Sequence, residues 1–228
     1  EIVVNEFLSF EGFVDSSYSH TDAEAEGDNE SDNSFQVDQV EISWLFNFDA
    51  VTAQIDLEYE DGDDGDNDGV EQAFVNLALS NGDVVTAGRY ASMLGFEAYE
   101  PTGLYQYSTA YDFSGFLGDA GLDGILDGAT VSEYSQGVKF TRSTDTTFFG
   151  ISVQNQAFGS DADRLGGDSD DDQDSSFGVE VAGSIDLGNG FTVFAGAAFE
   201  DAEFGDNQLI NAYVTYETGA WLFAAEIN

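Results

Sequence analysis

The segment VTAQIDLEYE, residues 51–60, alternates strictly between apolar and polar side chains. Its apolar positions are Val51, Ala53, Ile55, Leu57 and Tyr59. A period of two predicts a β-strand that turns one face toward an apolar environment. The segment is about as long as the 9–11 residues that a tilted strand needs to cross a bilayer. A soluble sheet with one buried face would show the same alternation, so repetition along the chain has to decide between the two settings.

Similar segments continue on both sides of this one and predict about eleven strands. They are 6–18, 36–48, 51–60, 72–80, 84–90, 135–142, 146–155, 177–187, 191–199, 209–217 and 221–227. The pattern predicts an all-β, antiparallel up-and-down transmembrane β-barrel of about 11–12 strands, with 1–228 as one barrel domain. Because bacterial single-chain barrels have an even strand number, we expect either a further strand within 98–134 or a larger barrel of up to about 16 strands.

The connections between these segments alternate in length. Short turns are predicted at Asp49, Asn81, Ser143, Gly188 and Thr218, and long acidic connections after Tyr18, Tyr59, Tyr90, Asn155 and Phe199. Outer-membrane barrels have short periplasmic turns and longer external loops. Aromatic residues also gather near the predicted strand ends, as in the girdles of such barrels. The combination favours a membrane barrel over a soluble sandwich.

The composition excludes several classes of partner. The chain has 46 acidic residues against 4 basic ones and a formal net charge of −42. Nucleic acid is excluded because phosphate contacts need Lys and Arg, and so is a basic face held on anionic lipid. The charge fits a salt-rich or calcium-rich setting, or a surface that handles cations. With no apolar run of about 18 residues, a closed barrel is the membrane-spanning structure left.

The alternation stops in RYASMLGFEAYEPTGLYQYSTAY, residues 89–111, which opens the longest connection, 90–134. A connection of that length usually has a function, and we predict that this one narrows a pore. The predicted constriction residues are Arg89, Glu97, Glu100 and Lys139. A cation facing carboxylates would select permeants by charge. The alternative is that Arg89 only pairs with Glu97 or Glu100 and pins the loop.

The segment LGFEAYEPTGLYQYS, Leu94 to Ser108, preceded by AGRY at 87–90, resembles the β-barrel porins of Gram-negative outer membranes, of the OmpL-like type. The rest of the chain is similar in style rather than by motif. The resemblance implies a diffusion channel in that membrane and more strands than the sequence displays. A channel of this kind is expected to contact outer-membrane lipid and lipopolysaccharide, to pass small solutes or cations, and to form a homo-oligomer such as a trimer.

A second motif offers cation ligands. Asp64, Asp66 and Asp68, followed by Gly69, have the D-x-D-x-D-G spacing of a calcium loop, in which alternate carboxylates converge on one hard cation. An EF-hand would need Glu at the twelfth position, which is Val75. The segment therefore predicts either a structural Ca²⁺ in an external loop or a solvated acidic loop, and the proposed channel requires no cofactor.

Enzyme chemistry finds little support in these residues. The one histidine, His20, lies in a predicted acidic loop, and no Gly-rich phosphate loop lies between a strand and a helix. We therefore expect a passive outer-membrane porin, not an enzyme, whose acidic lumen and mouth favour cations or small neutral solutes. Two alternatives stay open: a calcium-stabilised extracellular adhesin or surface-layer protein, and a structural envelope barrel without an open pore.

Overall fold

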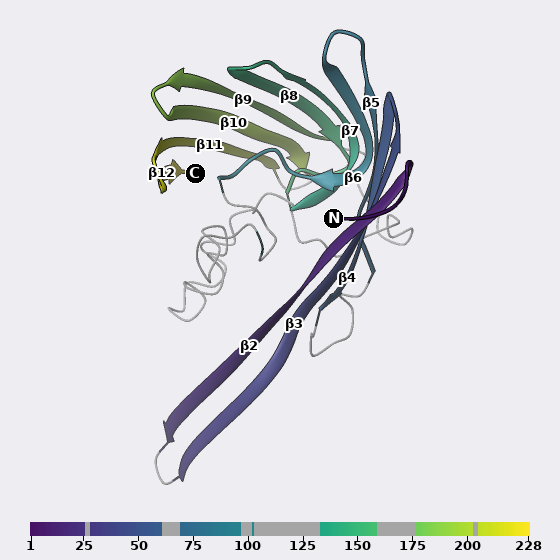
Figure 1. The fold of residues 1–228 in the computed structure, drawn as a ribbon. Coiled ribbons are helices and arrows are strands. Elements are labelled where there is room, and N and C mark those ends of the chain that lie inside the picture. The colour runs from purple at the N-terminus through teal and green to yellow at the C-terminus, as the bar shows by residue number, and fades with distance from the viewer. Residues whose placement is uncertain (26–27, 61–68, 97–101, 103–132, 159–176, 203–204) are drawn as a thin grey trace.

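A computed structural model describes residues 1–25, 28–60, 69–96, 102, 133–158, 177–202 and 205–228. It contains one antiparallel sheet of twelve strands that follow one another in chain order (Figure 1). The strands are β1 (Ile2–Asn5), β2 (Leu8–Ala25), β3 (Asp28–Phe48), β4 (Val51–Glu60), β5 (Gly69–Ala78), β6 (Asp83–Ala91), β7 (Tyr134–Ser143), β8 (Thr147–Gln154), β9 (Gly178–Gly188), β10 (Phe191–Ala202), β11 (Gly205–Thr218) and β12 (Trp221–Ile227). No helix of the described residues is long and apolar enough to cross a membrane.

This architecture confirms the predicted all-β, antiparallel up-and-down fold class. The strand that the sequence pattern missed is β1, whose four residues IVVN are too few to show an alternation. In the described part of the chain the pairing order begins at β1 and ends at β12, so the sheet is open in this structure. Figure 1 shows strands β7 to β12 as a curved arch, and we call its concave side the inner face.

The first hairpin is longer than predicted. We expected a solvated loop from His20, but β2 and β3 continue their pairing to Ala25 and Asp28. β4 pairs with β3 only from Gln39 onward, so the far part of the hairpin is a two-stranded ribbon that projects from the sheet (Figure 1). Apolar alternation is absent there because a ribbon with no third strand has no face to bury.

The alternation of short and long connections is partly confirmed. The predicted short turns are present, with positive φ at Asp49, Gly82, Asn189 and Gly219. At the opposite end, however, the pairing of β10 with β11 continues as far as Ala202 and Gly205. The connection that was predicted to be long after Phe199 is therefore short. The long connections are those between β4 and β5, β6 and β7, and β8 and β9.

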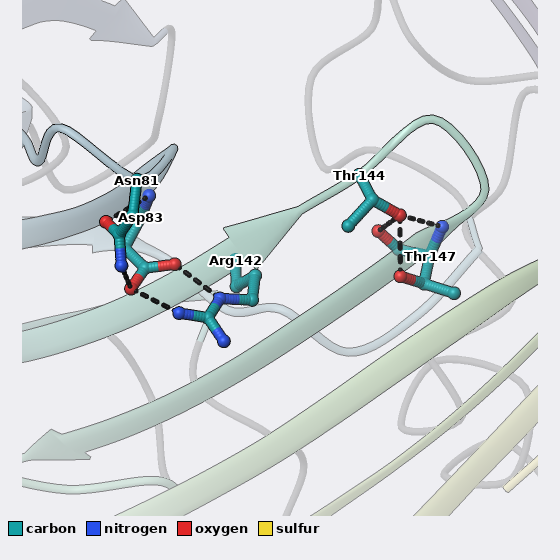
Figure 2. Close-up of polar contacts among 5 residues, drawn as sticks. All are labelled: Asn81, Asp83, Arg142, Thr144 and Thr147. Atoms are coloured by element: carbon teal, nitrogen blue, oxygen red, sulfur yellow. Dashed lines mark hydrogen bonds and ion pairs between the residues drawn. The ribbon is translucent and has the colours of Figure 1, made fainter.

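An ion pair joins neighbouring hairpins at the short-turn end (Figure 2). Arg142 of β7 donates from Nε and an Nη atom to the two carboxylate oxygens of Asp83, at 2.5 and 2.7 Å. Asn81 donates to the same carboxylate at 2.7 Å, and the hydroxyl of Thr144 accepts the Thr147 backbone N–H at 3.0 Å. These contacts fix the β5–β6 and β7–β8 turns relative to each other.

The two faces of the sheet have the reverse of the usual polarity. Along β8, Ile151 and Val153 are exposed, whereas the alternating residues Ser152 and Gln154 are buried. Other exposed apolar residues are Ile42, Ile55, Leu57, Val75, Leu77, Val138, Phe149, Ile185, Val193, Ile210 and Val214. Buried polar residues are Gln39, Glu41, Ser43, Asp56, Glu58, Thr86, Glu180, Asn211 and Thr215. The apolar residues point outward and the polar ones inward.

Aromatic side chains stack on one another at the short-turn end. The ring centroids of Phe7, between β1 and β2, and Phe48, at the end of β3, are 5.6 Å apart. Phe191 stacks on Tyr216 at 4.3 Å, and Phe223 lies 6.3 Å from both Tyr216 and Trp221. The predicted clustering of aromatic residues near strand ends is present at this rim.

Candidate functional site

The chain after β6 folds across the inner face. Past Ala91, residues 92–96 leave the β-ladder and run toward β11 and β12 (Figure 1). The Ser92 N–H still bonds to the Glu133 carbonyl at 2.8 Å, but the next residues have no neighbouring strand, and three of their N–H groups bond to side chains of β9, β11 and β12. Met93 N–H donates to Glu180 at 3.1 Å, Gly95 N–H to Asn211 at 3.1 Å and Phe96 N–H to Glu226 at 3.1 Å. We call residues 92–96 the inward segment.

Two wall glycines make room for the side chains of the inward segment. A Cβ added at Gly150 would lie 2.4 Å from the sulfur of Met93, and one added at Gly196 would lie 2.3 Å from a methyl of Leu94. Leu94 is buried with Ala157, Phe158, Ala182, Phe194 and Ala198 in an apolar cluster on the inner face. The β8–β11 part of the inner face is therefore filled by apolar contacts with this segment.

The β3–β5 part of the inner face is acidic. Glu41, Asp56, Glu58 and Glu71 are all buried there. Glu58 accepts a bond from Gln39 at 2.7 Å, and Glu41 accepts one from Ser43 at 2.7 Å. We call these four carboxylates the acidic wall.

Amide donors and a bulge complete the acidic wall. Asp56 accepts bonds from Gln54 and Gln72, each at 2.9 Å. The register of β4 and β5 shifts between Asp56 and Leu57, which leaves Glu71 as an extra residue opposite β4. Such a β-bulge re-aims a side chain that regular alternation would send to the other face. Glu71 thereby joins carboxylates of the inner face.

Three of these carboxylates are close enough to share one cation. An oxygen of each of Glu41, Asp56 and Glu71 lies within 4.8 Å of the others. Hard divalent cations are held by carboxylate oxygens converging in this way. Of the described residues, this is the group with the geometry of a metal ligand set.

Lys139 faces the interior of the arch, as the alternation predicted. It lies opposite Thr86 of β6 and Ser152 of β8, and Ser152 lies opposite Glu180 of β9. Its Nζ lies 4.4 Å above the ring of Tyr90 and 3.4 Å from the Ala91 carbonyl oxygen. Lys139 therefore supports the chain at the point where the inward segment begins.

Arg89 belongs to the other face by register. It lies opposite Ala73 and Gln136, in the row that continues to the exposed Ile55. Its Nε donates to the Glu71 carbonyl at 2.7 Å, and its guanidinium lies 5.8 Å from the centre of the Tyr134 ring. A bulge interrupts the ladder at Glu71, and Arg89 supplies a donor to the carbonyl there.

The other predicted site residues lie outside the described part of the chain. These are Glu97 and Glu100 of the predicted constriction and Asp64, Asp66 and Asp68 of the predicted calcium loop. The predicted constriction 90–134 is described at 90–96, 102 and 133–134. Its role in narrowing a pore, and pairing of Arg89 with either glutamate, stay predictions.

Sequence reasoning missed the acidic wall and the residues that hold the inward segment. The alternation already assigned Asp56 and Glu58 to a polar face. It could not show that they meet Glu41 and Glu71, because the meeting depends on strand register and on the bulge. No local signal could have linked Ser92 to Glu180, which is 88 residues away in the chain.

No protein-family model matches the chain, and no curated protein sequence matches it. A triple mutant of the Rhodopseudomonas blastica porin is 17% identical, over 96% of this chain and 83% of that one, with a TM-score of 0.41. A loop-deletion mutant of OmpT, an outer membrane protein of Vibrio cholerae, is 13% identical, over 96% and 91%, with a TM-score of 0.34. Similarity at these levels leaves the function to be argued from the site itself.

Proposed function

We propose that this protein is a passive diffusion channel of the Gram-negative outer membrane, with an acidic interior that favours cations or small neutral solutes. The observation that carries the proposal is the reversed polarity of the sheet. Apolar side chains such as Ile151 and Val153 are exposed, while charged ones such as Glu58 and Glu180 are buried on the inner face. A bilayer supplies the apolar surroundings that the outer face requires. In the membrane the open edges of the sheet would have to close into a barrel, so that their backbone groups are hydrogen-bonded.

The inward segment supports a channel with a narrowed interior. It crosses the inner face and packs on β8 to β11, so a path for solutes would run on the side of the acidic wall. Carboxylates along that path attract cations and repel anions. The net charge of −42 acts in the same direction. The resemblance at residues 94–108 supports the same function, and with it contact with lipopolysaccharide and assembly into a homo-oligomer.

The test is conductance of the purified protein in a planar lipid bilayer under a KCl gradient. We expect discrete channel steps and a reversal potential that shows preference for K⁺ over Cl⁻. In the variant E41Q/E58Q each new side-chain amide still offers one acceptor oxygen, but two negative charges of the acidic wall are removed. We expect it to lower the K⁺/Cl⁻ permeability ratio by about twofold or more, as attraction over about 8 Å in water predicts.

The matched control is E217Q, because Glu217 is an exposed carboxylate beside a short turn. This control should keep the wild-type permeability ratio. Wild-type protein that gives no steps, or that prefers Cl⁻, contradicts the proposed channel. An E41Q/E58Q variant with unchanged selectivity contradicts the role of the acidic wall.

A calcium-stabilised extracellular β protein is the second candidate function. It is favoured by the convergence of Glu41, Asp56 and Glu71, and by the spacing of Asp64, Asp66 and Asp68. This function predicts a protein that stays soluble without detergent and whose melting temperature rises with Ca²⁺. A channel predicts a need for detergent, with or without Ca²⁺.

A structural envelope barrel is the third candidate, favoured by the apolar cluster around Leu94 and Phe194 that fills part of the inner face. It differs from the channel only in conductance. Membrane insertion with no channel steps would select this reading.

A further inference from the structure

We propose that Glu180 is the positioning residue that holds the inward segment against strands β8 to β11 and thereby sets the width of the channel. The proposal rests on the proposed channel function and adds to it a residue that controls the opening. It begins from the place where β6 ends, because the chain there must turn away from its ladder after Ala91.

Glu180 accepts two hydrogen bonds from the start of the inward segment. It is fully buried in β9, and its carboxylate accepts the Ser92 hydroxyl at 2.7 Å and the Met93 backbone N–H at 3.1 Å. The two oxygens share these bonds, one donor each. A carboxylate suits the position because it accepts on both oxygens, whereas an amide presents one acceptor and one donor group.

The effect of Glu180 extends to Leu94. The Ser92 hydroxyl that donates to Glu180 also accepts the Leu94 N–H at 3.1 Å. Glu180 therefore orients the hydroxyl that receives this amide. Leu94 follows into the space above Gly196, where no Cβ occupies the wall. Loss of the carboxylate should loosen three successive residues and release the side chain that fills this part of the inner face.

The buried charge of Glu180 has a cationic neighbour in the same row of the sheet. Ser152 of β8 lies opposite Lys139 of β7 on one side and Glu180 of β9 on the other. The cation and the carboxylate therefore lie on the same face, one on each side of Ser152. Hydrogen bonds and a nearby ammonium group offset the free-energy cost of removing a carboxylate from water. The charge at Glu180 is thus compatible with its burial.

The test uses the absence of cysteine in the natural chain. A single Leu94→Cys reports whether the inward segment is seated, because Leu94 is only 5% exposed. We expect Glu180→Gln to raise the rate of thiol labelling at this cysteine by about tenfold, as loss of a hydrogen bond to a charged group predicts. Without the reporter cysteine, E180Q should give larger and noisier channel steps than the wild type.

A second variant tests reversibility. In E180Q with Leu94→Cys and Gly196→Cys, the two positions face each other across the contact, so oxidation should tether the segment to the wall. We expect wild-type conductance when this variant is oxidised and the enlarged steps after reduction with dithiothreitol. Ser92→Ala removes the hydroxyl that donates to Glu180 and accepts the Leu94 N–H, but it leaves the Met93 bond to Glu180. It should change labelling and conductance in the same direction by a smaller factor. E217Q is the control with the same charge change at an exposed site.

Unchanged labelling and unchanged conductance in both E180Q and Ser92→Ala would overturn the assignment of Glu180. Reduced yield of folded protein with wild-type steps in the molecules that do insert would also overturn it, since that result marks a purely structural residue. Wild-type protein without channel steps would contradict the channel, whereas the labelling comparison would still test the position of the segment.

Discussion

At the scale of single residues, the inner face depends on side chains that satisfy more than one buried group. Asn211 of β11 is fully buried and serves three partners. Its oxygen accepts the Gly95 N–H, and its nitrogen lies 2.6 Å from oxygens of Glu226 and Asn228. A buried donor left without its acceptor loses the hydration it had in the unfolded chain, so one deletion affects several groups.

We predict that Asn211→Ala destabilises the protein by about 1–3 kcal/mol, because the Gly95 N–H and the Glu226 carboxylate each lose a buried partner. Urea unfolding in detergent micelles, followed by the fluorescence of Trp44 and Trp221, measures the change. The control is Asn47→Ala, since Asn47 is exposed and its side chain accepts only the Asp49 N–H of a turn. Its effect should stay within about 0.5 kcal/mol. Equal stabilities of the two variants would contradict the prediction.

At the scale of elements, the length of a strand does not show how much it stabilises the sheet. β2 and β3 are the longest strands, with 18 and 21 residues. β3 has a second neighbour only from Gln39, where its pairing with β4 begins. The projecting ribbon beyond that point exposes the aromatic pair Tyr18 and Phe35, whose ring centroids are 4.8 Å apart. A two-stranded ribbon is marginally stable in water, so this part adds little to the folding of the sheet.

We predict that the ribbon can be shortened without loss of the fold. Ser19 and Ser34 are cross-strand partners, so residues 20–33 can be replaced by Asn-Gly, which forms a two-residue hairpin turn in this register. The melting temperature in detergent should shift by less than about 4 °C, the shift that roughly 1 kcal/mol produces in a domain of this size.

Hydrogen exchange on the unshortened protein gives an independent check of this prediction. Amides of 19–25 and 28–34 should exchange faster than those of 39–48, which have strands on both sides. Equal protection of the two stretches, or failure of the shortened chain to fold, would show that the ribbon stabilises the sheet.

At the scale of the whole molecule, the sheet has an apolar outer face and an inner face that carries the buried polar side chains and one apolar cluster. Exposed Phe149, Ile151 and Val153 lie on the outer side of β8, while Ser152 and Gln154 lie on the inner side. In water such an outer face would favour aggregation, and in a bilayer it would lie in its preferred solvent. The stacked aromatic residues at the short-turn end fit an interface with the polar head groups.

We predict that Ile151→Arg costs about 2–4 kcal/mol of folding free energy in lipid vesicles, because a charge on the lipid-facing side is costly near the middle of the bilayer. Thr147→Arg is the control on the same strand and face, close to the short turn, and should cost about 0–1 kcal/mol. Unfolding in urea, followed by the change in gel mobility between folded and heated protein, measures both. If the two variants were equally stable, the outer face would be in water and the membrane setting would be contradicted.

The sequence by itself determined the existence of eleven of the twelve described strands and which face of each is apolar. Alternation along 51–60 and its repetitions is local, so it placed Ile55 outward and Asp56 inward without knowledge of the fold. The turn at Asn81 to Asp83 was equally local, since Gly82 permits the positive φ that the turn needs. β1 was missed because its four residues, three of them apolar, are too few to show a period.

Only the tertiary structure decided how these faces meet. The acidic wall exists because register places Glu58 opposite Glu41 and because a bulge directs Glu71 toward them. The inward segment is held by Glu180, whose partner Ser92 is distant in sequence. Register and long-range contact depend on the packing of all strands together, and no short stretch of sequence carries that information.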